Sequence, residues 1–222
     1  MLDAARQLFV VCDFDGTITT QDTLDLLVNH YAPDSWQRAE ERLLAGEISL
    51  LQAMEEEFRQ VRATEQEALA FLLSAAVIRP GFAEFVRWLE EADHRLVIVS
   101  AGFRVVIDAV LARAGLGHLH VHAGDATFTS AGTLVSYPPA AVDCVDACGI
   151  CKVEIIAAHG PFSGPLVYVG DGYSDRCAAR EADLIFARGG LAAYLTAEGV
   201  SFEPYDDFFQ VGLALEARYG IG

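Results

Sequence analysis

Basic residues are scarce in this chain of 222 residues, in which 15 lysines and arginines stand against 32 aspartates and glutamates. The formal net charge is −17 at pH 7. A surface this acidic repels nucleic-acid backbones and anionic membranes, so we expect no nucleic acid and no membrane as partners. An anionic substrate would need a local cation at its binding site.

Cysteines and long apolar runs are also few. Five cysteines do not make a disulfide scaffold in a chain of this size. The first residues lack the basic start, the apolar stretch and the cleavage site of a signal peptide. No run approaches the roughly 18 apolar residues of a membrane span. We therefore expect a cytoplasmic protein.

Apolar residues make up 53% of the chain, which is ample for a buried core. Four short apolar runs are typical of strands buried on both faces. They lie at residues 8–12, 95–100, 165–170 and 183–187. Helical patterns separate them at 82–89, 105–114, 152–159 and 175–182, and a β-hairpin is expected near 120–137. The alternation predicts an α/β fold with a Rossmann-like, doubly wound parallel sheet.

Residues 20–78 interrupt this alternation. They contain no convincing strand, only amphipathic helical spacing such as Leu24, Leu27 and Val28. About sixty residues of helix are too long for a strand crossover, which takes about a dozen or more residues. We predict a helical cap domain over residues 20–78, inserted into a core domain formed by residues 1–19 and 79–222.

Two carboxylates, Asp13 and Asp15, follow the first predicted strand. In an extended segment, residues two apart face the same side. Carboxylates this close repel each other unless a cation lies between them or one takes a proton, and a metal ion satisfies both. The alternative for an isolated Asp-x-Asp-Gly is an aspartate that caps a helix.

The second predicted strand ends at Ser100, Ala101 and Gly102, where a helix is expected to begin. A hydroxyl with free backbone amides at a helix N-terminus makes an anion site. Serine is also an ordinary helix N-cap, which is the alternative role for Ser100.

Acidic residues also follow the third predicted strand. Asp171 and Asp175 lie beside glycine turns and could complete an oxygen shell for Mg²⁺. Lys152 opens the preceding helix. A lysine there is usually solvated, but it could supply the cation that an anionic substrate needs.

The joint order of these four motifs resembles the haloacid dehalogenase superfamily, in its phosphatase branch. The resemblance covers the whole chain, including a helical cap between the first and second motifs, as in phosphoserine phosphatase-like members. It implies that Asp13 is a nucleophile that forms an aspartyl-phosphate and that Asp15 is a general acid and base. It further implies that Ser100, with the backbone at Ala101 and Gly102, holds the phosphoryl oxygens.

The resemblance also implies a charge-neutralising role for Lys152, which would help to hold the phosphoryl group. Mg²⁺ would bind Asp13, the backbone carbonyl of Asp15 and Asp171, and Asp175 would support that shell. The implied activity is Mg²⁺-dependent hydrolysis of a phosphomonoester. A phosphotransferase on the same machinery and a binding protein that has lost activity are the alternatives.

The implied substrate is a small phosphorylated metabolite. The segment CDFDGTITTQDT and the cysteine run before Lys152 resemble the methionine-salvage branch, which acts on the enol phosphate 2-hydroxy-3-keto-5-methylthiopentenyl-1-phosphate. Phosphoserine is the alternative substrate. The cap arginine that would bind its carboxylate aligns near Glu55-Glu56, although Arg59 and Arg62 lie close by. The chain is expected to be a monomer or a homodimer.

Three cysteines, Cys144, Cys148 and Cys151, cluster just before Lys152. They could bind zinc with a histidine as the fourth ligand, form a disulfide, or stay reduced and packed. The candidate histidines are His118, His120, His122 and His159. Cys12 and Cys177 are expected to be small core residues.

Overall fold

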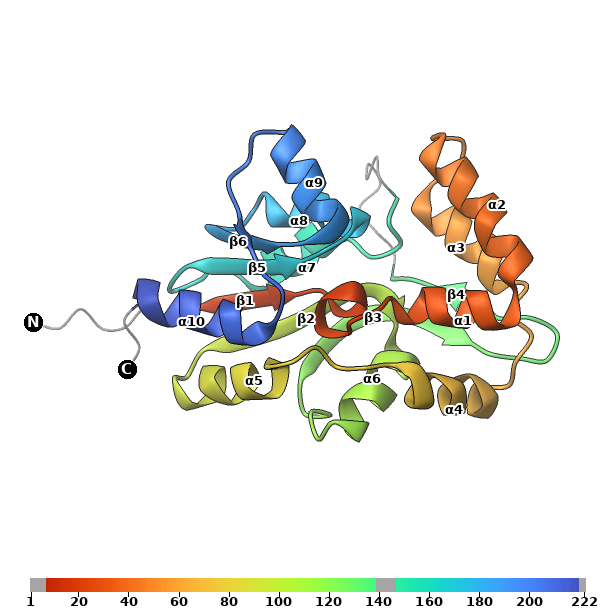
Figure 1. Cartoon of the computed structure of the whole chain (residues 1–222), viewed down its shortest axis with the longest axis horizontal. Helices are drawn as coiled ribbons and strands as arrows, with labels where there is room; N and C mark the ends of the chain where they lie inside the picture. Colours follow the sequence, from red (N-terminus) through yellow and green to blue (C-terminus); the bar gives the residue numbers. More distant parts are fainter. Residues whose placement is uncertain (1–6, 139–146, 220–222) are drawn as a thin grey trace, which may run out of the picture.

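The computed structural model describes residues 7–138 and 147–219, which form a seven-stranded sheet with helices on both faces (Figure 1). The strand order is β4-β3-β2-β1-β5-β6-β7, and every neighbouring pair is parallel except β3 and β4. The strands are β1 (Phe9–Cys12), β2 (Arg95–Phe103), β3 (His120–Thr127), β4 (Leu134–Ser136), β5 (Leu166–Gly170), β6 (Leu184–Ala187) and β7 (Glu203–Pro204). The predicted α/β class and parallel sheet are confirmed.

The sheet is buried on both faces, which explains why its central strands read as continuous apolar runs. One face packs against α5 (Phe82–Glu91), α6 (Arg104–Arg113) and α10 (Phe208–Tyr219). The other packs against α7 (Lys152–His159), α8 (Arg176–Ala179) and α9 (Gly189–Ala197). Alternate residues of β1 enter the two layers, with Val10 on the first side and Val11 on the second.

Some boundaries differ from the sequence expectations. The expected hairpin exists as β3 and β4, but β3 also pairs in parallel with β2 and is therefore a full member of the sheet. Strand β2 runs three residues further than expected, to Phe103. The helix expected at 175–182 is shorter, since a 3₁₀ turn at Tyr173–Asp175 precedes α8 and α8 already ends at Ala179. The apolar spacing in the sequence did not predict helices α9 and α10 or strand β7.

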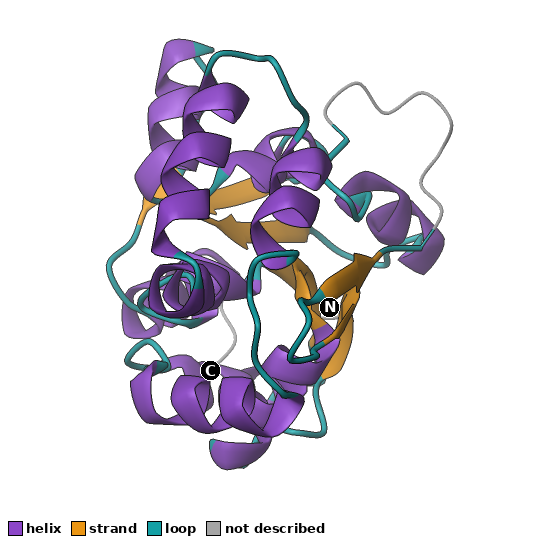
Figure 2. Ribbon diagram, turned by 90° about the vertical axis from the view of Figure 1, so that its right-hand side faces the viewer, coloured by secondary structure: helices purple, strands orange, loops and turns teal. Residues whose placement is uncertain are grey.

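The segment between β1 and β2 is helical, as predicted. It contains α1 (Thr23–Tyr31), α2 (Pro33–Leu44), α3 (Leu50–Phe58) and α4 (Glu65–Ala75), which Figure 2 shows from a second direction. Capping boxes built on Ser49 and Thr64 start α3 and α4. An antiparallel bridge between Thr19 and Ile78 joins the two ends of the segment.

Helices α1, α3 and α4 share a hydrophobic cluster with the sheet layer. Leu27, Phe58 and Leu72 of these helices pack with Phe103 and Phe128. The rings of Phe58 and Phe103 meet edge to face, with centroids 4.7 Å apart. This contact fixes α3 above the end of β2.

No helix among the residues that the structure describes has the length and apolar character to cross a membrane.

Candidate active site

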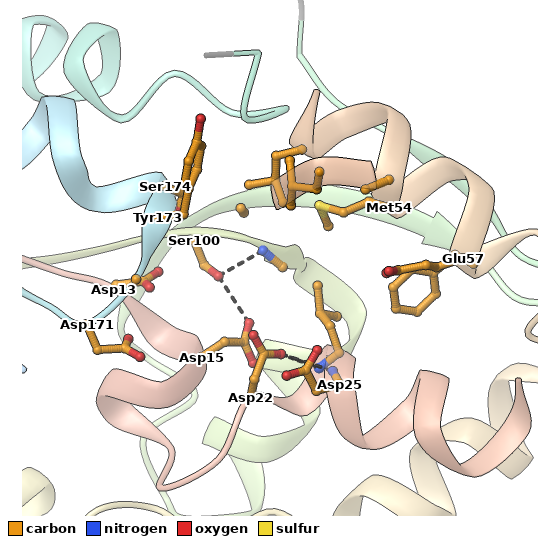
Figure 3. Close-up of a pocket in the computed structure, with 18 residues that line it drawn as sticks. Asp13, Asp15, Asp22, Asp25, Met54, Glu57, Ser100, Asp171, Tyr173 and Ser174 are labelled. Carbon is orange, nitrogen blue, oxygen red and sulfur yellow. Dashed lines mark hydrogen bonds between the residues drawn. The ribbon is translucent and has the colours of Figure 1, made fainter. Parts of the chain in front are cut away.

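The loops after β1, β2 and β5 meet at one edge of the sheet, because β1 lies between the other two strands. In doubly wound sheets, ligands bind at this point, outside the carboxyl ends of the strands. A cavity of about 250 Å³ lies here, between the strand ends and helices α1–α3 (Figure 3). The predicted residues that line it are Asp13, Asp15, Ser100, Ala101, Gly102 and Asp171. Lys152 and Asp175 lie behind this lining.

A buried ion-pair network connects Asp13, Lys152 and Asp175. The Lys152 Nζ atom is 2.7 Å from Asp13 Oδ1 and 2.7 Å from Asp175 Oδ1. Burial opposes the charge on Lys152, but the two carboxylates outweigh burial and raise its pKa. Burial and the nearby Asp175 carboxylate raise the pKa of Asp13, while the Lys152 ammonium opposes that shift. Lys152 therefore contacts the predicted nucleophile directly but does not line the cavity.

Asp175 is fully buried, and both of its oxygens accept hydrogen bonds. Oδ1 accepts from Lys152 Nζ at 2.7 Å and from the Tyr168 hydroxyl at 2.6 Å. Oδ2 accepts from the backbone amides of Asp171 and Gly172, both at 2.9 Å. This arrangement fixes the Lys152 side chain and the loop after β5.

Asp15 is held between two elements. Its Oδ1 accepts hydrogen bonds from the backbone amide and the hydroxyl of Thr23, the first residue of α1. Its Oδ2 accepts from the Ser100 hydroxyl at 3.3 Å. Burial raises the pKa of Asp15, although the hydrogen bonds from Thr23 and Ser100 oppose this. The helix-capping alternative is wrong for Asp13, whose side chain makes no cap hydrogen bond.

Ser100 lies inside β2, three residues before its end, and α6 begins at Arg104. The N-cap alternative for Ser100 is therefore wrong, and so is the expectation of a helix N-terminus at this point. The Ser100 Oγ atom instead accepts the Gly102 amide at 2.9 Å. A Cβ atom on Gly102 would lie 2.4 Å from Asp15 Oδ2, so this close approach requires glycine.

Asp171 faces the turn that follows β1. Its Oδ1 accepts the Thr17 hydroxyl at 2.7 Å. Gly16 has φ +70°, and a Cβ atom there would lie 2.3 Å from Asp171 Oδ2. Burial raises the pKa of Asp171 to about 7, and the Asp175 carboxylate adds to the shift.

The donor set suits a hard divalent cation. Carboxylate oxygens of Asp13, Asp171 and Asp175 all lie within 4.8 Å of one another. Six acidic residues line the cavity, and among its described lining residues there is no lysine or arginine. This concentration of negative charge, which Lys152 contacts from behind at Asp13, fits Mg²⁺, because Mg²⁺ prefers carboxylate, carbonyl and water oxygens. Because Asp175 already accepts four hydrogen bonds, Asp13 and Asp171 are the better side-chain ligands.

Helices α1, α2 and α3 supply the opposite side of the cavity, which we call the cap wall. Its apolar members are Leu24, Leu43, Leu50, Ala53, Met54 and Phe58. Asp22, Asp25 and Glu57 are its acidic members (Figure 3). Neither Arg59 nor Arg62 lines the cavity.

Sequence reasoning missed Arg79 and Tyr137, which also position the site. Arg79 is buried and donates to the backbone carbonyls of Thr17 at 2.7 Å and Thr19 at 3.0 Å, which holds the turn after β1. Its place immediately before Pro80-Gly81, at the return from the helical segment, was an available signal. Tyr137 donates its hydroxyl to the Ala101 carbonyl at 2.8 Å. No local pattern marked this tyrosine.

The cysteine predictions have mixed outcomes. Cys12 is a buried core residue, as predicted, but Cys177 is exposed, and that prediction was wrong. Cys144 lies outside the described residues, while Cys148 and Cys151 are half-buried. The zinc, disulfide and reduced alternatives for these three cysteines are therefore untested.

Known proteins resemble this chain along most of its length. The sequence pattern of the haloacid dehalogenase-like hydrolases matches residues 10–180. A 2-hydroxy-3-keto-5-methylthiopentenyl-1-phosphate phosphatase of Brevibacillus brevis is 32% identical over 85% of this chain and 86% of its own. One of the same name from an Exiguobacterium species is 30% identical over 91% and 94%.

The solved structure of a phospho-aspartyl intermediate analogue of phosphoserine phosphatase shares the fold. Its TM-score is 0.66 at 16% identity, over 94% of this chain and 98% of that one. The resemblance expected from the four motifs is thus confirmed by sequence relatives and by fold. The chain belongs to the family of haloacid dehalogenase-like hydrolases.

Proposed function

We propose that the protein is a Mg²⁺-dependent phosphatase that hydrolyses a small phosphomonoester through an aspartyl-phosphate. One observation carries this proposal: Asp13 contacts Lys152 at 2.7 Å and shares one cavity with Asp15, Ser100 and Asp171. A nucleophile, a proton donor and phosphoryl-binding groups are what phosphoryl transfer requires. The phosphatase names of the sequence relatives support the same activity.

The chain's own residues carry the chemical steps. A carboxylate oxygen of Asp13 attacks phosphorus, and the bond from phosphorus to the leaving oxygen breaks as Asp15 donates its proton to that oxygen. A water molecule then gives a proton to Asp15 while the oxygen of that water attacks phosphorus. The bond between Asp13 and phosphorus breaks, which releases phosphate and restores both carboxyl groups.

The remaining residues position these groups. The Ser100 hydroxyl and the backbone at Ala101 and Gly102 face the cavity, where they can bind phosphoryl oxygens, and Lys152 offsets the charge of Asp13. A bound Mg²⁺, held by Asp13, Asp171 and the Asp15 carbonyl, would supply positive charge for the phosphoryl oxygens. Asp175 would keep Lys152 and the loop after β5 in place.

The cap wall favours 2-hydroxy-3-keto-5-methylthiopentenyl-1-phosphate as the substrate. As its name states, this molecule carries a methylthio group and no carboxylate. The side chains of Leu50, Met54 and Phe58 offer an apolar surface for an uncharged thioether. The carboxylate of phosphoserine would face Asp25 and Glu57 without a cation among the described lining residues. We propose that helices α1–α4, within residues 20–78, act as the cap that selects the substrate.

The test is Mg²⁺-dependent phosphate release from a panel of monoesters that includes the enol phosphate, phosphoserine and p-nitrophenyl phosphate. We expect release by the wild-type protein, its loss with a chelator or in Asp13→Asn, and the highest kcat/KM for the enol phosphate. A higher kcat/KM for phosphoserine than for the enol phosphate would contradict the proposed substrate. No phosphate release from any monoester of the panel would contradict the proposed phosphatase activity. Phosphorylation of an added alcohol, in place of phosphate release, would identify a phosphotransferase.

A further inference from the structure

A second group of metal-ligating side chains lies away from the cavity. It consists of His120, His122 and His159, which we call the histidine cluster. The Nε2 atom of His122 is 3.0 Å from His120 Nε2 and 3.0 Å from His159 Nε2. Ligand atoms of all three residues lie within 4.8 Å of one another. None of them lines the cavity at the strand ends.

Two elements of the core bring these histidines together. His120 and His122 are two apart on β3, so their side chains leave the same side of the strand. Their partners in β2 are Val97 and Val99, which face the layer that contains α7. His159 is the last residue of α7, where the backbone carbonyls carry partial negative charge that favours a cation.

Hydrogen bonding cannot satisfy the three rings equally well. A neutral imidazole has one N–H donor and one acceptor nitrogen with a single in-plane lone pair. His122 Nε2 faces the Nε2 atoms of both His120 and His159, so at most one of the two contacts can be a well-aligned hydrogen bond. A shared cation, in contrast, can accept the lone pairs of all three Nε2 atoms at once.

The ring orientations agree with a shared ligand. The interplanar angles are 72° for His120 and His122, 77° for His122 and His159, and 83° for His120 and His159. The rings are therefore roughly perpendicular and do not stack, and His122 Nε2 contacts the Nε2 atoms of the other two rings. With Zn–N bonds of about 2.0–2.1 Å, tetrahedral ligands are about 3.3 Å apart, close to the observed 3.0 Å.

We propose that the histidine cluster binds a transition-metal ion, with Zn²⁺ as the best fit, through the three Nε2 atoms and with water in the fourth position. Three imidazoles suit Zn²⁺ and related ions, whereas Mg²⁺ prefers the oxygen donors at the strand ends. The positively charged guanidinium of Arg95 lies 3.5 Å from His159 Nδ1 and would repel a bound cation. We therefore expect weaker binding than at a structural site with four protein ligands. The ion would join the sheet edge to α7, the helix that begins at Lys152.

The test titrates Co²⁺, a spectroscopic substitute for Zn²⁺, and then Zn²⁺ itself, into the full-length, chelator-treated protein in excess Mg²⁺. We expect one Co²⁺ per chain with intense visible bands of a four-coordinate ion, and calorimetric binding of Zn²⁺ at the same stoichiometry. His122→Ala should weaken both by at least about tenfold. If this variant does not fold, His120→Ala, at an exposed position, replaces it with the same expectation.

His118→Ala is the matched control, because His118 is a nearby exposed histidine whose Nε2 pairs with Glu90 at 2.7 Å. This variant and Asp171→Asn should bind Co²⁺ and Zn²⁺ as tightly as the wild type. Equal affinity in His122→Ala and the wild type would overturn the proposal, as would the absence of visible bands. A thiolate-to-cobalt charge-transfer band that disappears in Cys151→Ser would assign the ion to the cysteines and overturn it too.

Discussion

The two sides of the cavity differ in how their residues are held. On the core side, Asp175 alone accepts four hydrogen bonds, and Lys152 joins it to Asp13. On the cap wall, Leu50, Met54 and Phe58 are held mainly by apolar packing. Hydrogen bonds and ion pairs fix atoms at defined positions, whereas apolar contacts depend on shape and volume. The core side therefore suits one fixed chemistry, and the cap wall suits substrate selection.

The comparison predicts that a small change on the core side abolishes turnover. Asp13→Asn keeps the size of the side chain but removes the nucleophilic carboxylate, and we expect kcat to fall by a factor on the order of 10⁴ or more. Asp22→Asn is the matched change on the cap side, where Asp22 caps α1. It should alter kcat by less than about tenfold, since asparagine is also a good N-cap. Comparable losses of kcat in the two variants would contradict the division of roles.

A second prediction concerns the buried ion pair. Asp175→Asn leaves Lys152 with one carboxylate partner fewer, and breaking such a pair costs about 3–5 kcal/mol of unfolding free energy. Tyr168→Phe removes one neutral donor to the same charged carboxylate and should cost about 1.5–3 kcal/mol. Denaturant unfolding measures both values. A smaller loss in Asp175→Asn than in Tyr168→Phe would show that the network does not hold the core side together.

A third prediction changes selectivity through the cap wall. Met54→Arg places a cation where the thioether is expected to bind, so kcat/KM for the enol phosphate should fall by about 10- to 200-fold. The same substitution should raise kcat/KM for phosphoserine, whose carboxylate gains a partner. Leu44→Arg is the control, because Leu44 is 81% exposed and does not line the cavity. An unchanged ratio of the two kcat/KM values in Met54→Arg would place selectivity elsewhere.

The smallest expected effect is at Tyr137, which contacts both sides of the cavity. Its hydroxyl donates to Ala101 O on the core side and lies 3.4 Å from Met54 Sδ on the cap wall. Tyr137→Phe removes a hydrogen bond of about 0.5–1.5 kcal/mol, so kcat/KM should fall about two- to tenfold. Steady-state kinetics on the enol phosphate measures this. A decrease as large as that of Asp13→Asn would give Tyr137 a part in the chemistry.

The sequence predicted the core side better than the cap wall. Asp13 and Asp171 follow apolar runs and Ser100 ends one, and parallel strands place their carboxyl ends at a common edge. The helical nature of residues 20–78 was also predictable from apolar spacing. Spacing does not say which helix faces the cavity, so the contributions of Met54 and Phe58 emerged only with the fold.

Long-range contacts account for the misjudged details. An N-cap role for Ser100 was an alternative because a helix was expected to begin after Gly102, yet pairing with β3 continues β2 to Phe103. Cys177 was expected in the core, but α8 is one short turn, and its exposed side includes this residue. Arg79 binds carbonyls some sixty positions away, a pairing that local patterns do not reveal.

The sequence by itself determined the class of the sheet, the helical insertion and the order of the acidic motifs, because these depend on local periodicity and on residue type. Only the tertiary structure decided that Lys152 contacts Asp13 from behind the cavity, that the cap wall lacks a cation among its described residues, and that His120, His122 and His159 converge. Each of these features joins segments that are distant in the chain. Their geometry follows from how the layers pack, and packing is a property of the whole fold.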